Sequence, residues 1–249
     1  MYIFDLDGTL IHNRAFRYAY KEIPKFLKIN INPEEFEEIF LNAYYEFVKA
    51  GKLKEAFDWD LLAKIALEKI GINCQEDVFL KLVLKGLEMG LIEIRAYARE
   101  ILKEIRALGG KVIILTNGYR KYQQPALEKT RLLELIHILL TNDDLIEPKP
   151  SKKAFEQALR IINVYDLESI MFIGDHPYYD IYGALNAGIE KIVWITDHHT
   201  KGSYLVRELA EDIINYAKSR YDIILDLSKF WNKEIEIIND LRELKRFLR

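Results

Sequence analysis

Short runs of branched apolar residues alternate with helical patterns along most of the chain, and this alternation limits the folds open to it. Such runs are typical of strands buried on both faces of a parallel sheet. The sequence predicts strands at Tyr2–Phe4, Lys111–Leu115, Ile136–Leu140, Ser169–Ile173 and Lys191–Ile195. Helical patterns lie between most of them, at Tyr97–Leu108, Gln124–Leu133, Ser151–Ile162 and Tyr178–Ala187. The alternation predicts an α/β fold, a Rossmann-like parallel sheet flanked by helices.

The segment after the first predicted strand has a different pattern. From about Asn13 to Leu91 there is no convincing strand, and apolar residues recur at helical spacing. Asn32 followed by Pro33 is typical of a capped helix start. We therefore predict an inserted small α-helical cap domain at residues 13–91, with a core domain formed by residues 1–12 and 92–249. The alternative is that these helices belong to the main layer.

The pattern is less regular after Trp194. A helix is predicted at Ser203–Arg220, a short strand at Asp222–Leu225, another strand at Glu234–Ile238, and a final helix from Asp240. These elements would extend the core domain.

Composition excludes several classes of function. The 249 residues carry a net charge of -3, with a pI near 6.0, which gives no overall electrostatic sign of nucleic-acid binding. The single cysteine, Cys74, excludes an intrachain disulfide and a cysteine-based metal site. No apolar run approaches the roughly 18 residues that span a bilayer, and the first residues do not resemble a signal peptide. We expect a soluble cytoplasmic protein without a membrane or nucleic-acid partner, and the sequence predicts no oligomeric state.

Asp5 and Asp7 directly follow the first predicted strand. Side chains at i and i+2 of an extended strand end point the same way, so the two carboxylates can share one site. Gly8 allows the sharp turn that follows. One carboxylate could attack phosphorus, while its neighbour protonates the leaving oxygen and later deprotonates water. The alternative is an ordinary helix cap or Asx-turn.

Later strand ends also carry polar residues. Thr116 and Asn117 begin a turn whose hydroxyl and backbone N–H groups suit a phosphate oxygen, although such a turn is more often structural. Lys149 lies between two prolines, which hold the backbone extended and leave its ammonium free to project. Asp175 and Asp180 follow the fourth strand and suit a hard cation, with a polar turn as the alternative.

These segments, taken in order, resemble the motifs of the haloacid dehalogenase superfamily. Residues 5–9 match its DxDGT motif, and Thr116 ends a hydrophobic strand as in its second motif. Residues 149–155 match its KPxxxxF segment, and residues 174–180 match GDxxxxD. The order of all four motifs, each at the end of a predicted strand, identifies the chain as a member of this superfamily.

The resemblance implies a role for each matched residue. Asp5 would be the nucleophile and Asp7 the general acid/base. Thr116, Asn117 and Lys149 would bind the phosphate, with Thr116 and Lys149 also contributing to catalysis.

The same resemblance implies a Mg²⁺ cofactor. Its ligands would be the Asp5 and Asp175 carboxylates and the backbone carbonyl of Asp7, while Asp180 would hold a metal-bound water or Lys149. The resemblance also points to the subfamily with a helical cap between the first and second motifs, which includes phosphoglycolate phosphatases, nucleotidases and N-acylneuraminate-9-phosphatases.

We therefore predict a Mg²⁺-dependent phosphatase that hydrolyses a small phosphorylated metabolite, a phosphate monoester, through an aspartyl-phosphate intermediate. Dehalogenases of the family lack the second aspartate, so Asp7 favours phosphoryl transfer. A phosphomutase acting on a sugar phosphate would also carry Asp7 and is the first alternative. A non-catalytic protein that binds a phosphate ligand is the second.

Candidates for contact with the rest of the substrate lie on the predicted cap. Asn13, Arg14 and Tyr18 follow the first motif, and Tyr44 and Lys52 are weaker candidates. Each such residue is more often part of a core or a solvated surface.

For several other polar residues we expect a structural role rather than a place in the site. His176 follows Asp175 and is expected to be a turn residue, while His198 and His199 are expected in a polar loop rather than at a second metal. Lys152 and Lys153 are expected on a solvated helix face.

Overall fold

A computed structural model describes residues 1–74, 77–161, 163 and 166–248 of the chain. Ile162, the predicted end of one helix, and Arg249, the last residue of the predicted core, lie outside the described residues.

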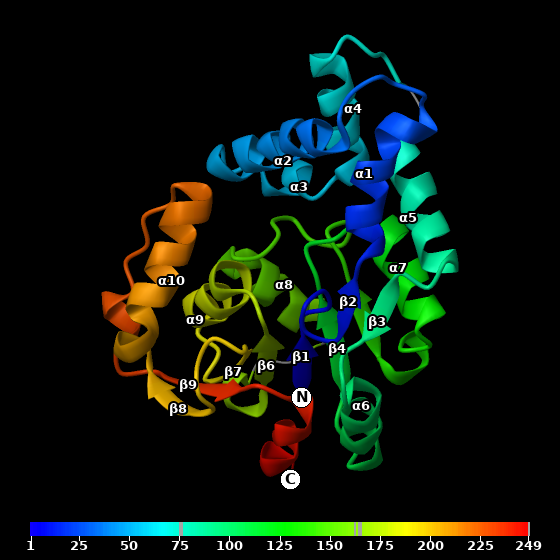
Figure 1. Ribbon diagram of the computed structural model, residues 1–249. Coiled ribbons are helices and arrows are strands. Elements are labelled where there is room, and N and C mark those ends of the chain that lie inside the picture. The colour runs from blue at the N-terminus through cyan, green and yellow to red at the C-terminus, as the bar shows by residue number, and fades with distance from the viewer. Residues whose placement is uncertain (75–76, 162, 164–165, 249) are drawn as a thin grey trace.

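A mostly parallel sheet forms the centre of the molecule (Figure 1). Within the described residues it has seven strands in the order β5-β4-β1-β6-β7-β9-β8. Their bounds are β1 Tyr2–Phe4, β4 Val112–Leu115, β5 Ile138–Leu140, β6 Met171–Gly174, β7 Lys191–Ile195, β8 Gly202–Leu205 and β9 Glu234–Ile238. All neighbouring pairs are parallel except β8 with β9. The predicted fold class is confirmed.

The period-2 alternation of each strand divides the core between the two faces of the sheet. Phe4, Ile114 and Ile173 pack on one side, with α6 (Ala98–Ala107). Ile3, Ile113 and Phe172 pack on the other, with α8 (Lys152–Ile161), α9 (Gly183–Ala187) and α10 (Val206–Tyr221). Because both faces are covered, these strands are apolar throughout.

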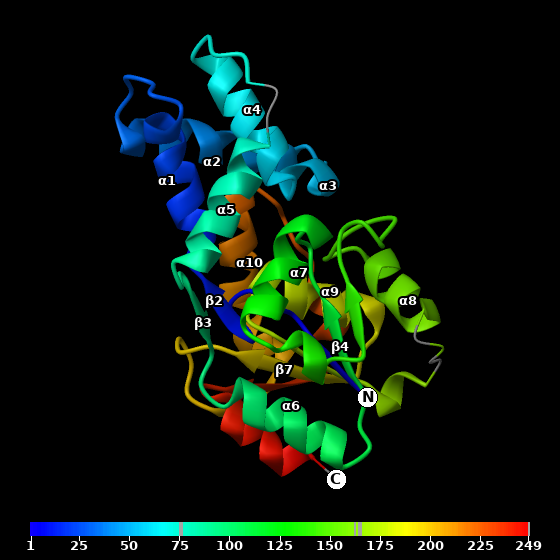
Figure 2. The same cartoon turned by 90° about the vertical axis from the view of Figure 1, so that its right-hand side faces the viewer.

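The connections of the sheet include further short helices. They are α7 Arg120–Lys129 and the single-turn or irregular helices η1 Leu133–Leu135, η2 Leu167–Ser169, η3 Pro177–Tyr182, η4 Ser228–Phe230 and η5 Leu241–Phe247. Figure 2 shows η5, in red at the C-terminus, lying beside α6.

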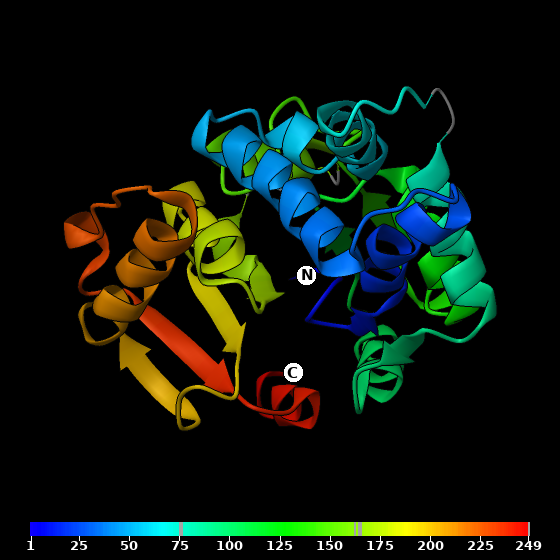
Figure 3. The ribbon, with the colours of Figure 1, turned by 45° about the horizontal axis from the view of Figure 1, so that its top comes forward.

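The helical segment formed by residues 15–74 and 77–88 gathers at one end of the molecule, beyond the ends of the parallel strands (Figure 1). Its helices are α1 Ala15–Phe26, α2 Pro33–Lys49, α3 Leu53–Ala56, α4 Trp59–Lys69 and α5 Val78–Glu88. In Figure 3 these blue-to-cyan helices lie together on one side, while α10, in orange, stands on the other. The helix predicted to start at Asn32-Pro33 is confirmed, and the Asn32 side chain accepts a hydrogen bond from the Glu34 N–H at 2.7 Å.

Two strands join this helical segment to the sheet. β2 (Ile11–Asn13) pairs antiparallel with β3 (Ile92–Ile94). The prediction of no strand from Asn13 onward is therefore wrong at its boundary. A three-residue strand is too short to show a readable period in the sequence.

The tail requires two corrections. Residues 202–205 form β8, so the helix predicted from Ser203 begins only at Val206. No strand forms at Asp222–Leu225 in the described structure, because Asp222 adopts a left-handed conformation (φ 58°) that ends α10 and redirects the chain. The strand at Glu234–Ile238 is confirmed, and the final helix is the 3-10 helix η5.

Two core helices also differ from prediction. α7 begins at Arg120, four residues before the predicted start, and contains Pro125. The helix predicted at Tyr178–Ala187 starts as a π-helix, η3, before continuing as α9. Helical periodicity detects such segments but does not distinguish their hydrogen-bond patterns.

No helix in the described part of the chain is long and apolar enough to cross a membrane.

Candidate active site

The first motif forms a tight loop at the end of β1. Gly8 has φ 88°, and a Cβ there would lie 2.2 Å from Oδ2 of Asp175, so a side chain is excluded both by conformation and by space. The Thr9 hydroxyl donates to Oδ1 of Asp175 at 3.0 Å. The loop therefore brings the first motif directly against the fourth.

Lys149 lies between two carboxylates. Its Nζ donates to Oδ1 of Asp5 and to Oδ1 of Asp180, each at 2.6 Å, and the side chain is almost fully buried. Burial lowers the pKa of Lys149, but the Asp180 and Asp5 carboxylates more than offset this effect and leave the pKa above its usual range. The ammonium stays charged at neutral pH.

Asn117 fixes the backbone of Lys149. Its side-chain amide donates to the Lys149 carbonyl and accepts from the Lys149 N–H, each at 2.8 Å. The structure thus places Asn117 as a buried support beneath Lys149.

Asp5, Asp175 and Asp180 each offer a carboxylate oxygen within 4.8 Å of the others. Burial and the neighbouring Asp180 carboxylate raise the pKa of Asp5 well above its ordinary value. The same two causes raise the pKa of Asp175 to about 7. Three carboxylates around one ammonium leave an excess of negative charge, which is costly in a buried site.

The two oxygens of Asp180 are both engaged. Oδ1 accepts from Lys149, and Oδ2 accepts from the backbone N–H of His176 at 3.0 Å. Asp5 and Asp175 each use only Oδ1 in the hydrogen bonds of the described residues. Hard oxygen atoms therefore remain available on Asp5 and Asp175.

Asp7 is linked to the second motif through Gln123. Gln123 on α7 donates through Nε2 to Oδ2 of Asp7 at 2.6 Å and to the Thr116 hydroxyl oxygen at 3.3 Å. Burial raises the pKa of Asp7 to about 6, although the Gln123 hydrogen bond opposes the shift. A carboxyl group with a pKa near neutrality can both give and take a proton.

A cavity of about 550 Å³ joins these groups to the helices of residues 15–88. We call its charged side the charged wall, formed by Asp5, Asp7, Lys149, Asp175 and Asp180. We call the rings that the helices of residues 15–88 and their connections contribute to the cavity the aromatic wall, formed by Phe16, Tyr44, Phe57 and Trp59.

Some of the substrate-contact candidates line this cavity. Asn13 and Arg14 do, as does Tyr44, but Tyr18 and Lys52 are not among its lining residues. Asn13 Nδ2 is buried and has no hydrogen-bond partner in the described structure. The Arg14 guanidinium is exposed and pairs with Glu93 at 3.0 Å.

His176 is a structural turn residue. Its Nδ1 accepts from the backbone N–H groups of Tyr178 and Tyr179, and its Nε2 lies 3.1 Å from the Tyr221 hydroxyl. Burial lowers the pKa of His176 to about 4, so the ring is neutral and caps the start of η3.

The other weighed residues also lie outside the charged wall. Among the described residues, Asp5, Asp175 and Asp180 form the only group of three or more potential metal ligands, and His198 and His199 belong to no such group. Lys152 and Lys153 are exposed and pair with Glu156 and Glu147.

Comparison with known proteins supports what this geometry suggests. The model of the haloacid dehalogenase-like hydrolases matches residues 1–188. The chain belongs to this family. The match includes all four motifs.

Individual relatives of the haloacid dehalogenase-like family are distant. Pyrimidine 5'-nucleotidase YjjG of Escherichia coli is 34% identical over 102 residues, which is 41% of this chain and 44% of that protein. The alignment thus spans less than half of that relative. Human N-acylneuraminate-9-phosphatase is 28% identical over 212 residues, covering 77% of this chain and 80% of that one. A haloacid dehalogenase-type phosphatase from Thermococcus onnurineus shares the fold, with TM-score 0.66, 22% identity and coverage of 99% and 96%.

Two further residues contact these motifs and are given no role by the sequence. Gln123 is one: it lies in the stretch that resembles the capped subfamily, and it is a polar residue on the buried face of α7, beside Tyr122 and Ala126. Arg95 is the other: its guanidinium donates twice to the carbonyl of Gly8, at 3.1 and 2.9 Å. Arg95 directly follows β3, and no local pattern predicts that this strand meets the first motif.

Proposed function

We propose that the chain is a Mg²⁺-dependent phosphatase that hydrolyses a small phosphate monoester through an aspartyl-phosphate on Asp5. The observation that carries the proposal is the arrangement of Lys149 between Asp5 and Asp180, with Asp175 and Asp7 lining the same cavity. Family membership agrees with it, and so do the activities named for the nucleotidase and the phosphatase relatives.

In the first step, a carboxylate oxygen of Asp5 attacks phosphorus. The bond from phosphorus to the leaving oxygen breaks, and the Asp7 carboxyl group gives its proton to that oxygen. The Lys149 ammonium and the Thr116 hydroxyl would bind the phosphoryl oxygens on which negative charge is concentrated.

In the second step, water attacks the phosphorus of the aspartyl-phosphate. The Asp7 carboxylate takes a proton from this water, and the bond between phosphorus and Asp5 breaks. Inorganic phosphate is released and both carboxyl groups return to their starting states.

The donor set fits a Mg²⁺ ion. The free carboxylate oxygens of Asp5 and Asp175 and the Asp7 backbone carbonyl are hard ligands of the kind Mg²⁺ takes. The excess negative charge of the three buried carboxylates would be balanced by a divalent cation. Asp180, whose oxygens are already engaged by Lys149 and His176, would support the site rather than bind the metal directly. When bound, the cation supplies positive charge to the phosphoryl oxygens.

We propose that residues 13–91 act as a cap domain over the core formed by residues 1–12 and 92–249. The cap would exclude water from the first step and select the leaving group. Asn13 is the strongest of its polar candidates for a substrate contact, because it lines the cavity and its buried Nδ2 has no hydrogen-bond partner among the residues that the structure describes. Arg14 is a weaker candidate, since Glu93 already pairs with it.

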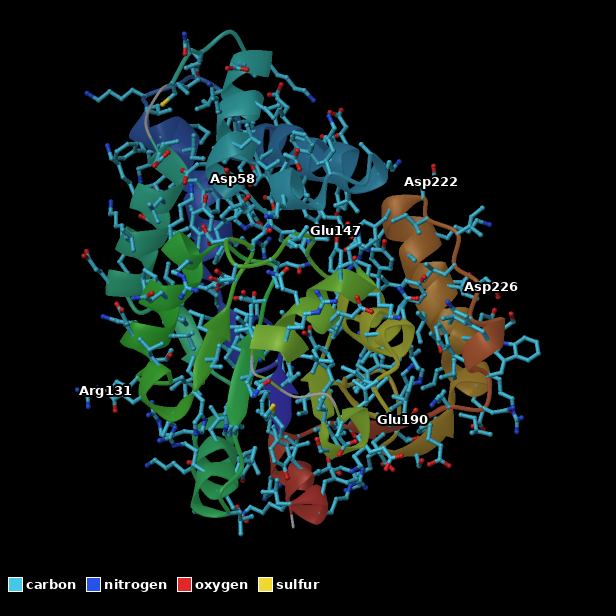
Figure 4. All side chains as sticks on the ribbon, turned by 180° about the vertical axis from the view of Figure 1, so that it is seen from behind. Asp58, Arg131, Glu147, Glu190, Asp222 and Asp226 are labelled. Atoms are coloured by element: carbon cyan, nitrogen blue, oxygen red, sulfur yellow. The ribbon has the colours of Figure 1, made fainter. Side chains whose placement is uncertain are left out.

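The test is phosphate release from 4-nitrophenyl phosphate by the purified protein. We expect activity with Mg²⁺, none with excess chelator, and restoration when Mg²⁺ is added back. Asp5→Asn removes the nucleophile and should lower kcat by about 10⁴-fold or more. Asp226→Asn is the matched control, because Asp226 is exposed and lies at the outer edge of the molecule beside α10 (Figure 4).

Full activity of Asp5→Asn, or of the chelated protein, would contradict the mechanism. A phosphomutase would instead rearrange a sugar phosphate without net release of inorganic phosphate. A non-catalytic protein would bind phosphate esters and leave them intact.

A further inference from the structure

Gln123 connects two groups of the site through one amide. It is buried, and its Nε2 donates to Oδ2 of Asp7 at 2.6 Å and to the Thr116 hydroxyl oxygen at 3.3 Å. The strand ends that carry Asp7 and Thr116 are neighbours in the sheet, since β1 pairs with β4. Helix α7, which follows the second motif, therefore contacts both Asp7 and Thr116 through Gln123.

The backbone leaves room for this amide. A Cβ at Gly118 would lie 2.0 Å from Nε2 of Gln123, so a residue with a side chain at position 118 would displace the amide. The glycine of the Thr-Asn-Gly turn therefore creates the space that Gln123 occupies.

The hydrogen bonds of Gln123 leave one oxygen of Asp7 free. Oδ2 accepts from the amide, whereas Oδ1 is buried, has no partner in the described structure, and belongs to a residue that lines the cavity. In a neutral carboxyl group held in this way, the proton sits on Oδ1, because Oδ2 uses a lone pair to accept the N–H. The amide thereby selects the oxygen that carries the transferable proton.

The Thr116 hydroxyl is oriented by the same means. Its oxygen accepts from the Gly118 N–H at 3.2 Å and from Gln123 at 3.3 Å. A hydroxyl oxygen has two lone pairs and one proton, so with both lone pairs occupied the O–H is left to donate elsewhere. Thr116 lines the cavity, where a phosphoryl oxygen is the acceptor that the proposed function supplies.

We propose that Gln123 is a positioning residue that presents the Asp7 proton to the leaving oxygen and the Thr116 hydroxyl to the phosphoryl group. The inference rests on the proposed phosphatase function. A neutral amide suits the task, because a carboxylate would repel Asp7 and an ammonium would favour the ionised form of Asp7, which has no proton to give.

The test compares leaving groups in Gln123→Met and Gln123→Glu, which keep the length of the side chain and remove the amide donor. The substrates are 4-nitrophenyl phosphate and phenyl phosphate, which have similar shapes. Nitrophenolate leaves without much help from an acid, whereas phenolate needs the proton. General acid catalysis contributes about 10²–10⁴-fold, and misplacing the acid should forfeit part of this. We expect kcat/KM for phenyl phosphate to fall about tenfold further than that for 4-nitrophenyl phosphate.

The controls separate this inference from a structural role and from the proposed function. Gln124→Met changes the next residue of α7, whose amide donates to Glu128 on the same helix, and should leave both kcat/KM values unchanged. The ratio of the two kcat/KM values does not depend on the fraction of protein that is folded, so a poorly folding variant still tests the role of Gln123.

An unchanged ratio in both Gln123 variants would overturn the role of Gln123. If the wild-type protein releases phosphate and Asp5→Asn abolishes this activity, the proposed phosphatase function would still stand. A wild-type protein that releases no phosphate would instead overturn the proposed function.

Discussion

The two walls of the cavity are built on different physical principles. In the charged wall, each ionisable group is held by a hydrogen bond from another part of the chain, as with Lys149 between Asp5 and Asp180. In the aromatic wall, the rings support one another: Trp59 stacks with Tyr44 at 5.8 Å between ring centroids and meets Phe16 edge-on at 5.6 Å. Buried charges need specific partners, whereas rings need only close packing.

This difference suggests that the two walls bind different parts of the substrate. A wall of fixed charges suits the phosphoryl group, whose chemistry is the same for every substrate. A wall of rings suits the leaving group, which changes from one substrate to another. The aromatic wall also contacts the core beside the charged wall, since the Tyr44 hydroxyl lies 2.9 Å from that of Tyr179 in η3, which contains Asp180. Changes to the charged wall should therefore act mainly on kcat, and changes to the aromatic wall mainly on KM.

The largest effect is expected from Lys149→Met, which breaks the charged wall at its centre. The substitution keeps the volume and removes the cation, so kcat should fall about 10²–10³-fold. It also leaves Asp5 and Asp180 buried without their partner, which should cost about 3–5 kcal/mol of unfolding free energy. Kinetics with 4-nitrophenyl phosphate and urea denaturation measure the two effects. Lys153→Met is the control, because Lys153 is exposed and pairs with Glu147 on the surface.

The stability of Lys149→Met should also depend on pH. Burial and the Asp180 carboxylate already raise the pKa of Asp5, and without the ammonium that opposes this shift the folded-state pKa of Asp5 rises further above that of the unfolded chain. Such a group contributes stability that is present at low pH and is lost as pH rises through the raised pKa. The destabilisation measured in chelator should therefore be smaller at pH 5 than at pH 8. A deficit that is equal at both pH values would contradict the pairing of Lys149 with the carboxylates.

An intermediate effect is expected from Trp59→Leu in the aromatic wall. Ring contacts contribute about 0.5–1.5 kcal/mol, so KM for phenyl phosphate should rise about two- to tenfold with little change in kcat. KM for methyl phosphate, which carries no ring, should change less. Trp231→Leu removes an exposed tryptophan beside η4 and should change neither value. A fall in kcat without a change in KM would contradict the proposal that the aromatic wall acts mainly on KM.

The smallest effect is expected from Arg14→Gln at the edge of the cavity. Arg14 and Glu93 are both well exposed, and such pairs contribute about 0–1 kcal/mol. We expect a change in unfolding free energy within this range and a rise in KM below about threefold. A tenfold rise in KM at low salt would instead make Arg14 a direct contact for the substrate charge.

The sequence predicted the buried strands and the capped helix start, because a local pattern of residues marks each of them. Buried strands such as Val112–Leu115 are apolar on both faces, and the start of α2 carries its cap in Asn32 and Pro33, so both were predicted near their true positions. β2, β3 and β8 were missed because three or four residues carry too little period, and their strand state comes from a partner elsewhere in the chain.

The sequence by itself determined where these residues stand along the chain: Asp5, Thr116 and Asp175 directly follow apolar strands, Lys149 lies in the loop beyond β5, and the sheet order then brings them together. Only the tertiary structure decided how they are held. Asn117 lines the cavity but bonds through its amide to the Lys149 backbone, Arg95 holds the Gly8 carbonyl, and Gln123 joins Asp7 to Thr116. Each of these contacts links residues at least 32 positions apart except that of Gln123 with Thr116, and no local pattern records such a contact. A side chain's partner is chosen by packing, which the spacing of residues along the chain does not fix.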